Sequence, residues 1–158
     1  KQAMASGVIP QITAVFGKCG GGLAVASAMT DFTFMEGKNG KLFLNSPNAI
    51  EGNEIAKCDT SSADFQSSKA GLVDVVGTEA EIMAEIRALV SVLPANNEDD
   101  ASYDECMDDL NRACAGIENA VEDTAIVAAM ISDNNVFFET KRAFAKDIFL
   151  LFTYFLAA

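Results

Sequence analysis

The sequence of 158 residues contains no histidine, and this absence removes several kinds of catalytic site at once. Ser-His-Asp and Cys-His arrangements, histidine-ligated metals and histidine proton shuttles all need an imidazole. The four cysteines, Cys19, Cys58, Cys106 and Cys114, form no Cys-x-x-Cys pair, so no zinc site is expected. We expect free thiols, as in the reducing cytoplasm, and no bound metal.

Positive charge is also scarce. The chain has 11 lysines and arginines against 23 aspartates and glutamates, which gives a formal net charge of -12 at pH 7. A surface of this sign repels phosphate backbones, so the composition argues against nucleic-acid binding.

Residues 148–158 are strongly apolar, but eleven residues are too few to span a bilayer, because a transmembrane helix needs about 20. We expect no membrane insertion, and instead a buried element that continues into further protein. No basic stretch followed by an apolar one opens the chain, so no secretory signal is predicted and the expected location is cytoplasmic. A chain that ends here and starts in mid-pattern at Lys1 is expected to be a fragment.

The apolar pattern predicts a soluble α/β domain. Residues 9–16 read as a buried strand, residues 17–22 as a glycine-rich turn and residues 23–29 as an alanine-rich helix. Further elements are expected along the chain: short strands at 31–36, 41–44 and 71–76, a helix start at 46–48, and a loop or weak helix at 52–70.

The most secure local prediction is a helix that begins at Thr78, because Thr78 and Glu81 have the spacing of a capping box. An apolar stripe follows, and Leu93 and Pro94 end it. Later segments are assigned by composition: an acidic excursion at 95–109, a helix at 118–131, an element with Phe137 and Phe138, and a helix at 141–149.

The glycine-rich turn at residues 17–22 is the first candidate site. A strand, a tight turn and a helix start direct several unpaired backbone N–H groups to one point, which suits a phosphate or a developing oxyanion. Gly17 and Gly22 have P-loop spacing, but Leu23 stands where a P-loop requires lysine, and no Gly-x-Gly-x-x-Gly pattern is present. A tight turn without further function is the alternative.

Serines and paired carboxylates are weaker candidates. Ser27, Ser46 and Ser61 have no histidine base, and Ser46 before Pro47 is more simply a helix cap. The acidic pairs at 99–100 and 108–109 do not have EF-hand spacing, so a solvated acidic face is the expected role.

Residues 10–36, PQITAVFGKCGGGLAVASAMTDFTFME, resemble the carboxyltransferase subunits of biotin-dependent acyl-CoA carboxylases and decarboxylases. That pattern is close to PQI-x4-G-x-C-A-G-G-x5-A-x-TDF-x-FM, and Gly20 replaces its usual alanine. The resemblance continues, in order, through residues 44–50, 68–73, 93–97, 109–112 and 137–147.

The resemblance implies an incomplete crotonase-like superhelix of strand-strand-helix units. Residues 1–147 would form the later part of the first carboxyltransferase domain, and 148–158 the start of a second domain that is missing. It also implies that the backbone amides of Gly21 and Gly22 form a catalytic oxyanion hole for the acyl-CoA thioester. The remaining expected substrate-binding residues are Gly17, Cys19, Gly20, Leu23, Ser46 and Pro47.

The same resemblance implies biotin on a carrier protein or domain, a biotin carboxylase partner and a homo-oligomer, either a dimer or a trimer of dimers. Biotin's own oxyanion hole would lie outside this chain, so we expect these residues alone to bind acyl-CoA weakly and to complete no carboxyl transfer. CoA is anionic, so its site must be a local exception to the net charge of -12.

Three alternatives stay open. The enzyme could run backwards as a decarboxylase, or the chain could be a non-catalytic scaffold of the same fold. A crotonase-like hydratase or isomerase would place glutamates near the oxyanion hole, and residues 17–30 contain none. The identity of the acyl group is left open.

Overall fold

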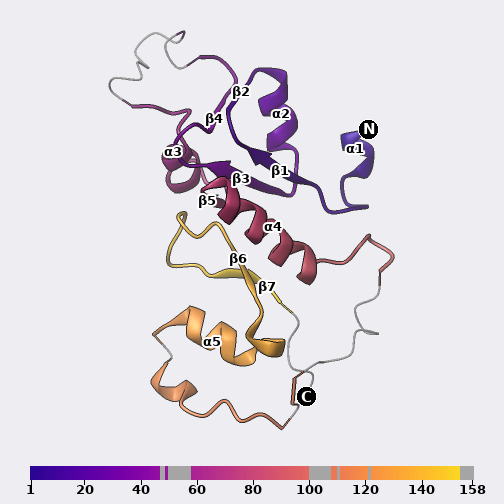
Figure 1. Ribbon diagram of the computed structural model, residues 1–158, viewed down its shortest axis with the longest axis vertical. Coiled ribbons are helices and arrows are strands. Elements are labelled where there is room, and N and C mark those ends of the chain that lie inside the picture. Colours follow the sequence, from indigo (N-terminus) through magenta and orange to yellow (C-terminus); the bar gives the residue numbers. More distant parts are fainter. Residues whose placement is uncertain (47–48, 50–57, 100–107, 110, 121, 154–158) are drawn as a thin grey trace.

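The computed structural model describes residues 1–46, 49, 58–99, 108–109, 111–120 and 122–153 (Figure 1). Its elements, in chain order, are α1 (Gln2–Ala5), β1 (Ile12–Val15), β2 (Lys18–Gly20), α2 (Gly22–Ala28), β3 (Phe32–Glu36), β4 (Lys41–Phe43), α3 (Ala63–Ser68), β5 (Val75–Gly77), α4 (Glu79–Val92), η3 (Ile117–Asn119), α5 (Thr124–Ile131), η4 (Asp133–Asn135), β6 (Phe138–Thr140) and β7 (Leu150–Phe152).

The first part of the chain repeats one unit, in which two strands are followed by a helix. The first strand of each unit joins a parallel sheet with the order β1-β3-β5, and the second strands β2 and β4 pair in a separate parallel sheet. Figure 1 shows α2 and α3 beside these stacked strands. The predicted α/β fold of strand-strand-helix units is therefore what the structure shows.

Strand β3 lies at the centre of its sheet and is buried on both faces. Phe32 and Phe34 point to one side, where they join Ile82 and Leu89 of α4 in one core cluster. Met35 faces the other side and belongs to a second cluster with Val15, Leu42 and Val73. A parallel strand covered on both faces reads as a nearly continuous apolar run, which is the pattern of FTFM in the sequence.

Helix α4 begins as predicted. The Thr78 side chain accepts a hydrogen bond from the Glu81 N–H, and the Glu81 carboxylate accepts one from the Thr78 N–H at 2.7 Å. These bonds satisfy two groups that a helix start leaves open. Leu93 ends the helix in an extended conformation.

Two helices predicted near the end of the chain are corrected: the one over 118–131 is shorter than predicted, and the one over 141–149 is not a helix. In place of one helix over 118–131, the structure has η3 and α5, because the Asp123 side chain caps the Ile126 N–H and starts a new helix there. Residues 141–149 form turns, and Lys141 and Ala145 have φ values of 54° and 48°, which no right-handed helix allows.

Other predictions are corrected in their bounds. The strand expected over 9–16 is confined to β1, and β2, which lies inside the glycine-rich turn, was not predicted. The predicted strand at 71–76 is displaced to β5, and a helix, α3, does form within 52–70. Pro47, Asn48 and the segments 52–57, 100–107 and 154–158 lie outside the described residues.

No helix within the described ranges is both long and apolar enough to cross a membrane. The apolar terminal segment 148–158 contains β7, and its Ile148, Leu150 and Phe152 are 66%, 53% and 39% exposed, so its described part is less buried than expected.

Candidate functional site

The three consecutive glycines at the junction of β2 and α2 differ in what their surroundings require. A Cβ on Gly20 would lie only 2.7 Å from Cε2 of Phe43, so the Phe43 ring occupies its place. Gly21 has a φ of 62°, a conformation that favours glycine. Gly22 has neither constraint, and no atom lies within 4 Å of where its Cβ would be. The turn is therefore open on its Gly22 side, where a ligand can approach.

The amides of the turn are not equivalent. The Gly21 N–H donates to the carbonyl oxygens of Phe43 and Leu44, at 3.0 and 3.1 Å, so it is not available to a ligand in this conformation. The N–H groups of Gly22 and Leu23, by contrast, have no backbone acceptor within the described part of the chain. Such first-turn amides carry the positive end of the helix dipole.

A cavity of about 340 Å³ adjoins the turn beneath α2. Its lining includes Gly17, Lys18, Cys19, Leu23 and Ser27. The structure thus brings together three of the predicted substrate-binding residues, although Cys19 is buried in the core and only its surface borders the cavity.

Of the predicted substrate-binding residues, all but Pro47 are among the described residues. Leu23 is 65% exposed and Gly17 is exposed, whereas Gly20 is half-buried beneath Phe43. Ser46 is exposed, and its carbonyl accepts the Ala49 N–H at 2.8 Å, which agrees with a turn at this point. Pro47 lies outside the described residues.

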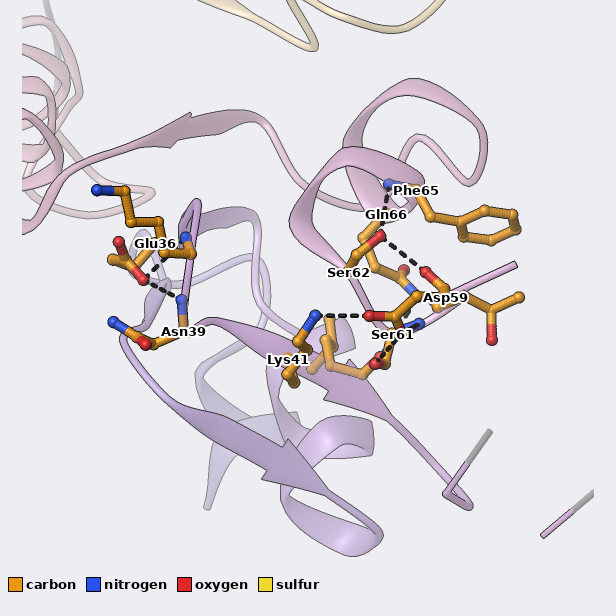
Figure 2. Close-up of polar contacts among 11 residues, drawn as sticks. Glu36, Asn39, Lys41, Asp59, Ser61, Ser62, Phe65 and Gln66 are labelled. Carbon is orange, nitrogen blue, oxygen red and sulfur yellow. Dashed lines mark hydrogen bonds and ion pairs between the residues drawn. The ribbon is translucent and has the colours of Figure 1, made fainter. Parts of the chain in front are cut away.

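A polar network of Lys41, Asp59 and Ser61 holds strand β4 in place, as Figure 2 shows. Lys41 Nζ lies 2.6 Å from a carboxylate oxygen of Asp59, and Ser61 donates both its N–H and its hydroxyl to that carboxylate. The Leu42 N–H also donates to the Ser61 carbonyl at 2.9 Å. These contacts fix the strand that presents the Phe43 carbonyl to Gly21.

Burial raises the pKa of Asp59, but hydrogen bonds from Lys41 and Ser61 outweigh it, so the net shift is downward. At the turn between β3 and β4, the N–H groups of Asn39 and Lys38 lower the pKa of Glu36 (Figure 2). Both carboxylates therefore stay ionised at neutral pH and serve as structural acceptors.

The serine and acidic candidates have structural partners. Ser27 Oγ donates to the Leu23 carbonyl at 3.0 Å and lies 3.5 Å from Cys19 Sγ. Asp108 pairs with Arg112 at 2.8 Å, and Asp99 accepts the Ala95 N–H. No group of His, Cys, Asp or Glu suited to a metal ion occurs among the residues that the structure places.

Charge is distributed unevenly around the site. Residues 1–44 carry four lysines and two carboxylates, which is a formal charge of +2. Because the net charge of the chain is -12, the remaining 114 residues carry a formal charge of -14. The glycine turn therefore lies in a part of the sequence whose local charge favours an anionic ligand.

Phe43 and Leu44 are the site residues that sequence reasoning missed. Their role depends on two carbonyl oxygens and one ring that reach a turn more than 20 positions earlier in the chain. The one local sign of such a contact was Gly20 in place of the usual alanine. This substitution cannot be interpreted until the Phe43 ring is known to lie against Gly20.

Comparison with known proteins gives a consistent result. The model of the family described as "Carboxyl transferase domain" matches residues 1–155. The chain is 34% identical, over 91% of its length, to the carboxyltransferase subunit of propionyl-CoA carboxylase from Haloferax mediterranei. It is 31% identical, over 96% of its length, to the alpha subunit of methylmalonyl-CoA decarboxylase from Veillonella parvula.

Among solved structures, transcarboxylase 12S with hydrolysed methylmalonyl-coenzyme A bound has a TM-score of 0.83 at 25% identity, over 97% of this chain. A single-chain long-chain acyl-CoA carboxylase has a TM-score of 0.72 at 17% identity and supports the fold alone. The chain covers 30% and 32% of the two relatives' own lengths and 32% of transcarboxylase 12S, about a third in each case.

Proposed function

The chain belongs to the carboxyl transferase domain family, and we propose that it forms the acyl-CoA-binding part of the carboxyltransferase component of a biotin-dependent acyl-CoA carboxylase. The observation that carries this proposal is the family match over residues 1–155. The crotonase-like fold of the related structures agrees with the strand-strand-helix units described above. Residues 1–147 are proposed to be the later part of the first domain of such a subunit, and 148–158 to begin a second.

The chemical task of this segment is to stabilise negative charge on a thioester oxygen. When the carbon next to the thioester loses a proton, the electron pair is shared with the carbonyl oxygen, which becomes an enolate oxygen. A preorganised N–H group directed at that oxygen lowers the barrier, because it needs no reorganisation during the reaction. The Gly22 N–H, free and next to open space, is suited to this role.

Gly21 is proposed as the second donor, with one condition. Its N–H is shared between the Phe43 and Leu44 carbonyls, so the substrate oxygen must displace them. An enolate oxygen is a stronger acceptor than a neutral carbonyl, since hydrogen bonds to charged groups are roughly twice as strong. The exchange therefore favours the transition state over the bound substrate, as catalysis requires.

Carboxybiotin, when bound, would supply the carboxyl group for the new C–C bond and an acceptor for the α-proton. No described residue is assigned to biotin. The role proposed for the residues of this chain is to hold the thioester. The +2 charge of residues 1–44 supports binding of the CoA phosphates nearby.

The second candidate function is the reverse reaction, in which a carboxyacyl-CoA loses its carboxyl group. The methylmalonyl-CoA decarboxylase relative favours it, because its 31% identity is close to the 34% of the carboxylase relative. Both directions pass through the same enolate, so the amide site serves either one.

The partners that we propose are a biotin carboxyl carrier, a biotin carboxylase component and further copies of the same subunit in a cytoplasmic assembly. The related transcarboxylase 12S assembles as a hexamer, which supports an oligomer. Nucleic acid is not proposed as a partner, because the net charge is -12.

Gly22→Pro tests the proposal. Proline removes the N–H donor but suits the first position of a helix, so α2 should be retained. In the assembled carboxyltransferase, transfer of the carboxyl group from a carboxyacyl-CoA to biotin should fall about 100-fold or more. The matched control, Gly22→Ala, retains the N–H, and its Cβ meets no atom within 4 Å, so transfer should be nearly unchanged.

Equal transfer rates in Gly22→Pro and Gly22→Ala would remove the Gly22 amide from the mechanism. Absence of any CoA-thioester binding by the unsubstituted protein, measured by calorimetry, would reject the proposed function as a whole.

A further inference from the structure

A second cavity, of about 270 Å³, borders a different face of α2 from the first and has no role in the reaction described so far. It is bordered by Ala24, Val25 and Ala28 of α2, by Phe43 and Leu44 at the end of β4, and by Leu72. Leu44 is 63% exposed and Val25 is 46% exposed, so two branched apolar side chains stand at its mouth.

The described lining of the cavity is almost wholly apolar. Gln66 is the one polar residue among the described lining residues, and its side-chain NH2 group already donates to the Thr60 carbonyl at 2.6 Å and to the Leu42 carbonyl at 3.4 Å. The lining therefore selects an apolar group. A volume just below the range of about 300–1,000 Å³ that is usual for whole ligands indicates a small one.

The cavity and the amide site share two residues. Phe43 and Leu44, which border it, supply the two carbonyls that hold the Gly21 N–H, and the N–H of Val25 donates to the Gly21 carbonyl. A thioester whose oxygen lies at the turn can therefore direct its hydrocarbon part into this cavity while the CoA part leaves in another direction.

We infer that this cavity receives the acyl chain of the substrate and that the Phe43 ring, which Gly20 admits, limits the length of that chain. The inference rests on the proposed function. The ring lies over Gly20, because a Cβ there would be 2.7 Å from Cε2 and 3.1 Å from Cζ of Phe43. Strand β4, fixed by Lys41, Asp59 and Ser61, keeps the ring in place, so Phe43 forms a rigid wall of the cavity.

The test measures binding of free CoA and of acetyl-, propionyl-, butyryl-, hexanoyl- and octanoyl-CoA by calorimetry. In the unsubstituted protein, affinity should rise about fourfold per added methylene, which corresponds to about 0.8 kcal/mol, until the chain reaches the Phe43 ring, and fall beyond that length. In Phe43→Ala, the tightest-binding chain should be longer by two or more carbons, while the affinity for free CoA stays the same.

Phe65→Ala is the matched control, because Phe65 is also half-buried and does not border the cavity. Gly20→Ala changes the position of the ring instead of removing it, because the added Cβ displaces the ring, and the chain-length optimum should change. The double variant Gly20→Ala with Phe43→Ala has no ring to displace, so it should behave like Phe43→Ala alone. Phe43→Leu carries the same expectation with a smaller shift if circular dichroism shows that Phe43→Ala does not fold.

An unchanged optimum in Phe43→Ala and Phe43→Leu, with CoA binding intact, would overturn the inference and leave the proposed function standing. If neither CoA nor any acyl-CoA binds to the unsubstituted protein, the proposed function fails and the inference fails with it.

Discussion

The two described ends of the chain are built in different ways. Residues 1–99 contain stacked parallel strands that bury side chains on both faces of β3. Among the described residues of 108–153 the buried side chains are few, namely Ala128, Ser132, Phe138 and Thr140, and Phe138 belongs to the core cluster of the first region. The second region therefore depends on the first for its core.

Aromatic and ionic contacts join the regions. The Phe138 ring packs against Phe32 and Phe34, at centroid distances of 6.5 and 6.0 Å. Lys141 pairs with Asp74 at 3.1 Å, and Arg142 pairs with Glu85 of α4 at 2.8 Å. Figure 1 shows α4 between the parallel strands and β6. The site, however, lies wholly in the first region, so chemistry and attachment can be separated by mutation.

The largest effect is expected from Phe138→Ala, which should break the shared core. Phe138 is 1% exposed, and removal of a buried aromatic ring costs about 3–5 kcal/mol of unfolding free energy. Urea unfolding measures the loss, and limited proteolysis should cut first within residues 108–153. Cleavage that begins instead in residues 1–46 would show that the first region depends on the second.

Lys141→Met should have an intermediate effect of about 2 kcal/mol. It leaves the Asp74 carboxylate, which is 3% exposed and also accepts the Thr33 N–H at 2.7 Å, without its cation. The loss is smaller than for a fully buried pair, because the Lys141 side chain is 30% exposed. Asp74→Asn in the same background should recover part of the loss, and a double-mutant cycle measures the coupling. Purely additive effects would show that the pair does not join the regions.

The smallest effect is a loss of stability in acid that acts on the first region. Backbone and hydroxyl donation from Thr78 lowers the pKa of Glu81, and the Asn39 N–H lowers that of Glu36, both from an ordinary value of 4.5. A carboxyl group with a lowered folded-state pKa stabilises the fold fully above its unfolded pKa and loses this contribution as pH falls through the folded value. The urea midpoint should therefore decline below about pH 4.5.

Glu81→Gln should flatten this acid-dependent decline, and Glu98→Gln, on an exposed glutamate outside any cap, serves as its control. Hydrogen exchange measured by mass spectrometry at pH 7 and pH 4 should show the added opening at the start of α4. An identical pH profile in Glu81→Gln would exclude the capping carboxylate as its cause.

Prediction from the sequence succeeded where a local interaction decides the structure. The start of α4 depends on Thr78 and Glu81, which are three residues apart, and the nearly continuous apolar run of β3 is visible in five residues. It failed where a distant partner decides. Residues 141–149 have helical composition, but Lys141 reaches Asp74, and Phe144 packs so closely on Gly71 that a Cβ there would lie 2.9 Å from the ring. These contacts hold the backbone in turns.

The candidate site follows the same division. The sequence by itself determined the glycine turn, its place between a strand and a helix, and the family, because these depend on residue order within one stretch of chain. Only the tertiary structure decided which amide is free, that Gly21 donates to Phe43 and Leu44, and why Gly20 has no side chain. Hydrogen bonds and steric contacts across more than 20 residues depend on how β4 stacks beside β2, and that stacking is a property of the assembled core.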